Sequence, residues 1–413
     1  MIEAIVLAGG LGTRLREAVP DLPKCMAPVA GKPFLSHVID ALRMQGVERF
    51  IFSLGYMAEV IEKYLQEHYP TLSYTVALEE EPLGTGGAIQ LAIQQAQTEN
   101  ILVANGDTLF RIQAKELFAV HEKNKAECTL ALKPMLNFER YGVVEIENSN
   151  KIISFKEKQF YKEGLINGGI YLVNKTALLS RNLPTKFSFE KDYLEEFCSE
   201  GKFYAAIQEG YFIDIGIPED YNKAQSDLKS IPLDLKKVDK SWTLFLDRDG
   251  VINDEIVGNY VLNWDGFKFS PGVLKALKIL SEKVGTIVVI SNQRGIGKGL
   301  MSEEDLADIH QKLLAEVKAT GGRIDHFFYC TEKDNTCFNR KPNPGMALQA
   351  ATQFPQIDLF KTIMVGNKPS DMRFGRAAGI YNVFITSTNP NEPFPHPDID
   401  LRFNSLLDFA LAL

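Results

Sequence analysis

Short apolar segments alternate with amphipathic stretches along this chain, and the series occurs twice. The strands expected in the first series are residues 2–7, 50–54 and 101–104, and the helices between them are 35–45 and 88–95. The strands expected in the second series are residues 243–246, 286–290 and 362–365, and the helices are 273–282 and 302–320. This alternation predicts an α/β fold with two domains, each a mainly parallel sheet flanked by helices.

The boundary between the two series is expected within residues 226–240. This stretch carries Pro232 and several charged residues, and it has no continuous apolar face. A chain of 413 residues is also too long for a single core to be the default. We therefore expect a first domain at residues 1–230, a linker at 231–240 and a second domain at 241–413.

Composition excludes several classes of protein. The net charge of −8 argues against a nucleic-acid partner, because such proteins neutralise phosphates with clustered Lys and Arg. The five cysteines are scattered and odd in number, which favours a reducing cytoplasm. Residues 2–7 read as a buried strand rather than a signal peptide, and no apolar run approaches the roughly 20 residues that span a bilayer. We expect a cytoplasmic protein without a membrane partner, and the oligomeric state stays open.

A glycine-rich segment follows the first expected strand. It contains Gly9, Gly10, Gly12, Thr13 and Arg14, and Lys24 lies a little further on. Glycines let backbone N–H groups close around phosphate oxygens, and the two cations would neutralise developing charge. A plain turn is the alternative. The segment lacks the Gly-Lys-Ser/Thr of the ATPase phosphate loop and the third glycine of the dinucleotide fingerprint.

Two carboxylates and a second glycine-rich segment complete the first half. Glu81, Gly84 and Thr85 open an expected helix, where bare backbone could approach a base or ribose. Asp107 follows an expected strand, and Asp214 lies within an apolar one, where a charge needs a cation. These positions suit Mg²⁺, although a solvated turn is the alternative for Asp107.

Residues 1–230 resemble the sugar-nucleotide pyrophosphorylase family, with the Gly-Gly-x-Gly-Thr-Arg signature and the downstream Pro-Lys intact. The resemblance implies a Rossmann-like domain in which Arg14 and Lys24 act on a nucleoside triphosphate and Asp107 and Asp214 bind Mg²⁺. It further implies contacts to the sugar phosphate from Glu157, Lys158 and Asn167. The finer pattern resembles the D-glycero-D-manno-heptose 1-phosphate guanylyltransferases, so GTP is favoured, while other bases and other sugars stay open.

In the second half, the expected buried strand 243–246 runs directly into Asp247 and Asp249. Two carboxylates so placed could divide the roles of nucleophile and general acid. A calcium loop is the alternative, but the further acidic ligands of that twelve-residue pattern are missing.

Residues 241–413 resemble the haloacid dehalogenase superfamily of phosphatases, in a form without a cap domain. The resemblance implies that Asp247 is the nucleophile and that Asp249 is the general acid and base. It assigns phosphate binding to Ser291, Asn292, Arg340 and Lys341, and Mg²⁺ to Asp247, Asp249, Asn367 and Asp371. Arg294 and Lys298 are candidates, with Arg340, for a second phosphate, and solvated surface charge is the alternative for these two.

Two departures from the superfamily pattern matter. Asn367 stands where an aspartate is usual, which predicts weaker Mg²⁺ binding or replacement by Asp371. The zinc loop of related phosphatases is half complete, because Cys330 and Cys337 are kept while Glu332 and Asn339 occupy the other two ligand positions. We predict no zinc.

Together the two resemblances predict a bifunctional enzyme of nucleotide-activated heptose biosynthesis for a surface glycan. The second half would dephosphorylate D-glycero-D-manno-heptose 1,7-bisphosphate at C7. The first half would transfer GMP from GTP to the resulting heptose 1-phosphate and release pyrophosphate. The alternatives are a mannose 1-phosphate-type transferase fused to a phosphatase of other specificity, or to a non-catalytic phosphosugar-binding module.

Overall fold

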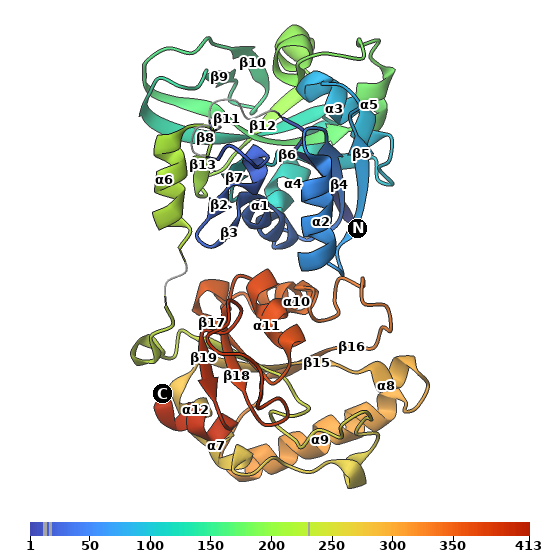
Figure 1. The fold of residues 1–413 in the computed structure, drawn as a ribbon, viewed down its shortest axis with the longest axis vertical. Helices are drawn as coiled ribbons and strands as arrows, with labels where there is room; N and C mark the ends of the chain where they lie inside the picture. Colours follow the sequence, from blue (N-terminus) through green and yellow to red (C-terminus); the bar gives the residue numbers. More distant parts are fainter. Residues whose placement is uncertain (11–14, 16–18, 230–231) are drawn as a thin grey trace. The chain divides into compact units, whose positions relative to one another are not determined.

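The protein forms two compact units, Met1–Ser230 and Ile231–Leu413, in a computed structural model (Figure 1). The structure describes residues 1–10, 15, 19–229 and 232–413. Leu233, Leu235 and Val238, from the segment predicted as a linker, pack against the core of the second unit.

The first unit is built on a seven-stranded sheet. Its strands, in spatial order, are β12 (Phe203–Ile207), β8 (Cys128–Phe138), β11 (Tyr161–Asn174), β6 (Asn100–Asn105), β1 (Ile2–Leu7), β4 (Val47–Leu54) and β5 (Ser73–Leu78). All neighbouring pairs are parallel except those of β11, which runs antiparallel to β6 and β8. Ala4 and Val6 of β1 join one hydrophobic core and Ile5 joins another, so both faces of the sheet are covered.

Helices and short strands surround this sheet. The helices are α1 (Phe34–Arg43), α2 (Ala58–His68), α3 (Gly84–Ile93), α4 (Ala114–Asn124), α5 (Lys175–Ser180), α6 (Pro218–Asp227) and the π-helix η2 (Phe189–Glu195). The short strands pair as β2 (Pro28–Val29) with β3 (Lys32–Pro33), β7 (Thr108–Phe110) with β13 (Phe212–Asp214), and β9 (Val144–Ile146) with β10 (Ile152–Phe155).

The second unit is built on a six-stranded sheet in which every pair is parallel. Its strands, in spatial order, are β16 (His326–Cys330), β15 (Thr286–Asn292), β14 (Thr243–Leu246), β17 (Thr362–Gly366), β18 (Tyr381–Ile385) and β19 (Leu401–Phe403). The helices are α7 (Val273–Lys283), α8 (Arg294–Gly297), α9 (Glu303–Ala319), α10 (Gly345–Gln353), α11 (Pro369–Ala377) and α12 (Leu406–Ala412). The predicted fold class, two α/β domains with mainly parallel sheets, is confirmed.

The helix predicted at residues 88–95 begins four residues earlier than expected. The helix expected from residue 88 begins at Gly84, because the glycines form its first turn against residues 185–187. A Cβ at Gly86 would lie 2.1 Å from the Phe187 ring, and one at Gly87 would lie 2.2 Å from the Thr185 carbonyl oxygen. The glycines thus serve close packing within the protein. Separately, none of the helices in the described part of the chain is long and apolar enough to cross a membrane.

Candidate active sites

In the first unit, a lysine ammonium lies between two carboxylates at the carboxyl edge of the sheet. Lys24 Nζ is 2.5 Å from Asp107 Oδ2 and 3.3 Å from Asp214 Oδ1. Asp107 follows β6, Asp214 ends β13, and the Ile215 N–H donates to the Asp107 carbonyl oxygen at 3.2 Å. We call these three residues the first centre. The fold brings together, from distant parts of the sequence, three side chains that the sequence assigned to catalysis and metal binding.

The opposite charges of the first centre stabilise one another. Burial by itself would lower the pKa of Lys24, but Asp107 and Asp214 outweigh it and raise that pKa above its ordinary value. The ammonium therefore stays charged at neutral pH. The same two carboxylates offer the oxygen donors that Mg²⁺ prefers, so the residues present fit the predicted cation.

The glycine-rich segment after β1 is described only in part, since Gly12, Thr13 and Arg14 lie outside the described residues. A Cβ at Gly9 would lie 2.6 Å from Glu79 Oε1, so glycine is needed for this close approach. Glu79 also accepts hydrogen bonds from Ser53 Oγ at 3.1 Å and from the Leu83 N–H at 3.2 Å. Glu79 thus ties together segments that the sequence assigned to the nucleotide, a role that the motifs did not reveal.

The other residues that the sequence predicts to bind the nucleotide differ in their surroundings. Thr85 Oγ1 donates to Glu190 Oε2 at 2.8 Å and accepts from the Phe189 N–H at 2.9 Å, so it fixes η2 to α3. Glu81 and Gly84 are exposed, and Gly10 is exposed beside Gly9. Their assignment to nucleotide binding stays a prediction.

The predicted sugar-phosphate residues do not join the first centre in the described structure. Glu157 and Lys158 are exposed. Asn167 instead shapes a turn within β11, where it donates to the Tyr171 hydroxyl at 2.9 Å and accepts from the Gly169 N–H at 3.0 Å. These three assignments stay predictions.

Arg140 and Tyr141 are residues near the first centre that the sequence did not indicate. Burial first, and then the nearby Asp214 carboxylate, raises the pKa of Tyr141 to about 12, so its hydroxyl stays protonated. Arg140 pairs with Asp220 of α6. Neither residue lies in a glycine-rich or acidic motif, so no local signal pointed to them.

The second unit repeats the arrangement with deeper burial. Lys341 Nζ lies 2.8 Å from Asp247 Oδ1 and 2.7 Å from Asp371 Oδ1, and it donates to the Ile290 carbonyl oxygen at 2.8 Å. We call Lys341, Asp247 and Asp371 the second centre. Asn292 positions Lys341 by accepting from its N–H at 3.1 Å and donating to its carbonyl oxygen at 3.0 Å. The structure thus shows Asn292 holding the lysine.

The two aspartates of the Asp247 segment are perturbed in opposite directions. Burial first, and then Asp371, raises the pKa of Asp247 to about 6, against the effect of Lys341. Burial would also raise the pKa of Asp249, but the Arg248 guanidinium and the Asn253 amide hold it below its ordinary value. Asp249 accepts from Arg248 Nη2 at 2.9 Å and from Asn253 Nδ2 at 3.0 Å. A cation bound beside Asp247 would lower this pKa and favour the ionised nucleophile.

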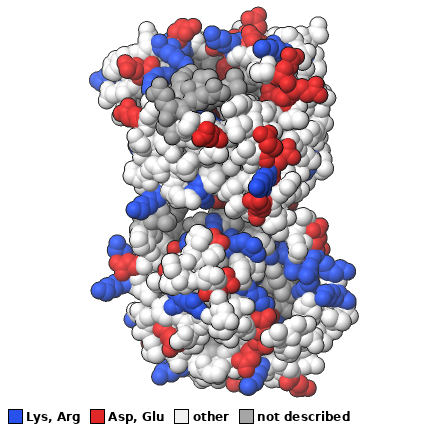
Figure 2. Space-filling model, viewed as in Figure 1, with Lys and Arg blue, Asp and Glu red and all other residues white. Residues whose placement is uncertain are grey.

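The other predicted phosphate residues line the same edge of the sheet. Ser291 Oγ, at the end of β15, accepts from Gln293 Nε2 at 2.7 Å. Arg340 donates from Nη1 to the Glu332 carbonyl oxygen at 2.9 Å. Burial first, and then the neighbouring Arg294, lowers the pKa of Arg340, so two guanidinium groups lie close together here. Figure 2 shows Lys and Arg side chains gathered on the second unit where α8 and the loop after β16 lie in Figure 1.

The second centre also fits a magnesium ion. Asn367 is fully buried, and its Oδ1 atom has no hydrogen-bond partner among the described residues. Asp247, Asp371 and this amide oxygen are the donor types that Mg²⁺ prefers. Within the described residues, no group of three or more His, Cys, Asp or Glu side chains converges to hold a metal. Cys330 and Cys337 are free thiols, and the absence of zinc stays a prediction.

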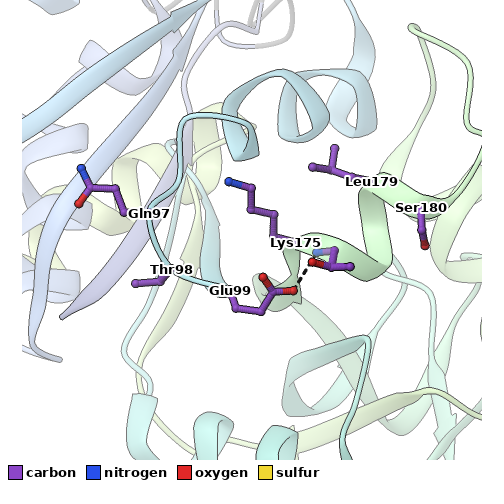
Figure 3. Close-up of a pocket in the computed structure, with 7 residues that line it drawn as sticks. Gln97, Thr98, Glu99, Lys175, Leu179 and Ser180 are labelled. Carbon is purple, nitrogen blue, oxygen red and sulfur yellow. Dashed lines mark hydrogen bonds between the residues drawn. The ribbon is translucent and has the colours of Figure 1, made fainter.

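A shallow pocket of the first unit lies away from the first centre (Figure 3). It is lined by Gln97, Thr98, Glu99, Lys175, Thr176, Leu179 and Ser180. These residues precede the start of β6 or belong to α5, whereas Asp107 follows the other end of β6. Ligands of open α/β sheets bind beyond the carboxyl ends of the strands, so we assign the chemistry to the centres and not to this pocket.

Parallel α/β units with a lysine between two aspartates at the carboxyl edge define a class of enzymes that transfer phosphoryl or nucleotidyl groups. The chain belongs to the nucleotidyl transferase family, which matches residues 3–231. Residues 246–409 match the family described as polynucleotide kinase 3 phosphatase. The two resemblances drawn from the sequence are confirmed, and the protein is a nucleotidyltransferase joined to a phosphatase.

Known proteins resemble the two units separately. A D-glycero-alpha-D-manno-heptose 1-phosphate guanylyltransferase of Aneurinibacillus thermoaerophilus is 50% identical over 228 residues, which are 55% of this chain and 99% of that protein. The crystal structure of HddC from Yersinia pseudotuberculosis complexed with GMP-PN is 37% identical, with a TM-score of 0.51, over 55% of this chain and all of that one. A D,D-heptose 1.7-bisphosphate phosphatase from B. bronchiseptica, complexed with magnesium and phosphate, is 28% identical with a TM-score of 0.39, over 41% of this chain and 97% of that one.

Proposed function

We propose that this chain carries out two consecutive steps in making a nucleotide-activated heptose. The second unit removes the C7 phosphate of D-glycero-D-manno-heptose 1,7-bisphosphate, and the first unit transfers GMP from GTP to the resulting heptose 1-phosphate. The observation that carries this proposal is that each unit has its own lysine between two aspartates at a sheet edge. The 50% identity to a heptose 1-phosphate guanylyltransferase supports the choice of sugar and base.

In the first unit, an oxygen of the sugar 1-phosphate attacks the α-phosphorus of GTP. The bond from that phosphorus to the β-phosphate bridging oxygen breaks, and pyrophosphate leaves. Lys24 stabilises the negative charge on the transferring group, and positioning supplies most of the remaining acceleration. Asp107 and Asp214 would hold Mg²⁺, which when bound neutralises phosphate charge.

In the second unit, Asp247 attacks the phosphorus of the C7 phosphate and forms an aspartyl phosphate. The bond from that phosphorus to the C7 oxygen breaks, and the sugar hydroxyl leaves with a proton from Asp249. Water then hydrolyses the aspartyl phosphate with Asp249 as the base. The Arg248 guanidinium and the Asn253 amide lower the pKa of Asp249, which favours the ionised state that can accept a proton from water. Asp247, Asn367 and Asp371 would hold Mg²⁺, which supplies positive charge for the nucleophile.

The test is a product screen with the purified chain. Pyrophosphate release is measured for each nucleoside triphosphate with heptose 1-phosphate, mannose 1-phosphate and glucose 1-phosphate, and phosphate release is measured with heptose 1,7-bisphosphate. We expect the highest kcat/KM with GTP and heptose 1-phosphate, together with phosphate release from the bisphosphate. Preference for mannose 1-phosphate would contradict the sugar assignment, and binding of the bisphosphate without phosphate release would make the second unit a binding module.

A further inference from the structure

Asn367 directly follows β17, and its side chain makes an unusual set of contacts. It is fully buried, and its Nδ2 atom donates to Glu255 Oε2 at 3.1 Å and to Thr388 Oγ1 at 2.5 Å. The oxygen of the same amide is buried without a hydrogen-bond partner among the described residues. Leaving a buried amide oxygen without a hydrogen-bond partner is unfavourable, so this atom is available to a ligand.

The orientation of the amide follows from its neighbours. An ionised carboxylate only accepts hydrogen bonds, so the amide atom facing Glu255 must be the nitrogen. Reversing the amide would place two oxygens 3.1 Å apart. With Glu255 and Thr388 taking both amide hydrogens, the oxygen is directed away from them.

The amide packs against the segment that carries the nucleophile. A Cβ at Gly250 would lie 2.0 Å from Asn367 Nδ2 and 3.1 Å from Asn367 Oδ1. The Asn367 N–H also donates to Asp371 Oδ2 at 3.2 Å. The Asn367 side chain therefore lies against the segment that follows Asp247, and the Asn367 backbone contacts Asp371.

We propose that Glu255 and Thr388 are positioning residues that orient the Asn367 amide, so that its oxygen rather than its nitrogen serves as a neutral ligand for Mg²⁺ beside Asp247 and Asp371. This inference rests on the proposed magnesium-dependent phosphatase. An aspartate at position 367 would instead face the Glu255 carboxylate as a like charge. Glu255 is itself held by Lys368, whose Nζ is 2.7 Å from Oε1.

A double-mutant cycle tests the pairing, using Glu255→Ala, Asn367→Asp and the two together in the full chain. Binding of MnCl₂ is measured by electron paramagnetic resonance without substrate, and the MgCl₂ concentration for half-maximal phosphate release is measured separately. All variants keep Asp107 and Asp214, so cation binding by the first unit is a common background. The matched control is Asp254→Ala, since this neighbouring carboxylate pairs with the exposed Lys268 at 3.3 Å.

We expect Glu255→Ala to weaken cation binding by about 10-fold or more in the natural background, as loss of a residue that orients a metal ligand does. In the Asn367→Asp background the same change should strengthen binding, because it removes a like charge. Asp254→Ala should leave binding unchanged. An effect of Glu255→Ala with the same sign and size in both backgrounds would overturn the inference, and so would unchanged binding.

Thr388→Val provides a second variant if Glu255→Ala fails to fold, which tryptophan fluorescence would reveal. It removes one acceptor of the amide hydrogens and should weaken MnCl₂ binding by less than Glu255→Ala. Unchanged binding in this variant would also count against the inference. If the effect of Glu255→Ala on MnCl₂ binding changes sign between the two backgrounds while neither the natural chain nor any variant releases phosphate, the proposed function fails and the inference holds. If phosphate is released and the effects of the two substitutions on MnCl₂ binding simply add, only the inference fails.

Discussion

The two centres share one arrangement and differ in burial. In the first centre, the lysine side chain is 15% exposed and its aspartates are 34% and 27% exposed. In the second centre the corresponding values are 2% for the lysine and 7% and 1% for the aspartates. Water can replace a lost partner in the first centre but not in the second. We therefore expect that substituting a side chain of the first centre changes stability little, whereas substituting one of the second centre destabilises its unit.

The largest expected effect comes from removing one charge of each centre. Asp107→Asn should lower pyrophosphate release at least about 10³-fold and leave phosphate release unchanged, while Asp247→Asn should do the reverse, because each removes a group that the reaction requires. Each reaction is assayed with its own substrate supplied directly. Loss of both activities in either variant would contradict separate centres.

The comparison of burial predicts a difference in stability between two lysine variants. Lys341→Met leaves two nearly fully buried carboxylates without their cation and should destabilise the second unit by about 3–5 kcal/mol. Lys24→Met should change stability by about 1 kcal/mol or less, because its partners reach solvent.

Urea unfolding measures both effects. Trp242 and Trp264 are the two tryptophans of the chain, and both lie in the second unit, so their fluorescence reports that unit alone. Circular dichroism follows the first unit in addition. Equal destabilisation by the two variants would show that the difference in burial has no energetic consequence.

The second unit should also lose stability in mild acid through His310. Burial first, and then Arg248, lowers the pKa of His310 to about 3, while its unfolded value is about 6.5. The folded state thus keeps His310 neutral, so its contribution is complete above pH 6.5 and is lost as the pH falls toward 3.

His310→Phe should lessen this loss, since the ring still stacks on Phe327, 4.0 Å away, but no longer titrates. Between pH 7 and pH 5 we expect a loss smaller by about 2 kcal/mol, measured by tryptophan fluorescence in urea. His68→Phe, at an exposed position of the first unit, is the control, and its unfolding is followed by circular dichroism. The same pH slope in His310→Phe and the natural protein would refute the assignment.

The smallest effect is expected at the incomplete zinc loop. Cys337→Ser should change stability by about 0.5 kcal/mol or less, because we predict that the half-buried thiol holds no structural metal. Elemental analysis of the purified chain should find no bound zinc. One zinc per chain, released by this substitution, would contradict the prediction.

Much of the fold and part of each centre could be predicted from the sequence. Residues 2–7 and 243–246 form strands with the expected bounds, because apolar runs between turn signals leave little choice. Asp107 could be assigned because residues after parallel strands meet at one edge of the sheet. Lys24 could be assigned from the family signature, and Asp214 because a carboxylate within an apolar strand needs a cation.

What escaped prediction depends on contacts between distant segments. Nothing in the sequence indicates that the Asn292 side chain binds both the N–H and the carbonyl oxygen of Lys341. Glu79 is one of three consecutive glutamates, and only the close approach of Gly9 distinguishes it. The pairing of Glu255 with Asn367 joins residues 112 positions apart. Such partners are set by tertiary packing, which motifs and periodicity do not encode.

The central claim, two centres acting in sequence, is tested most directly by following one reaction with ³¹P nuclear magnetic resonance. The natural chain is given heptose 1,7-bisphosphate, GTP and MgCl₂. We predict that inorganic phosphate appears first, that heptose 1-phosphate accumulates briefly, and that pyrophosphate and GDP-heptose follow. Pyrophosphate formed from the bisphosphate at the natural rate by Asp247→Asn would contradict the account, because transfer would then not require the second centre.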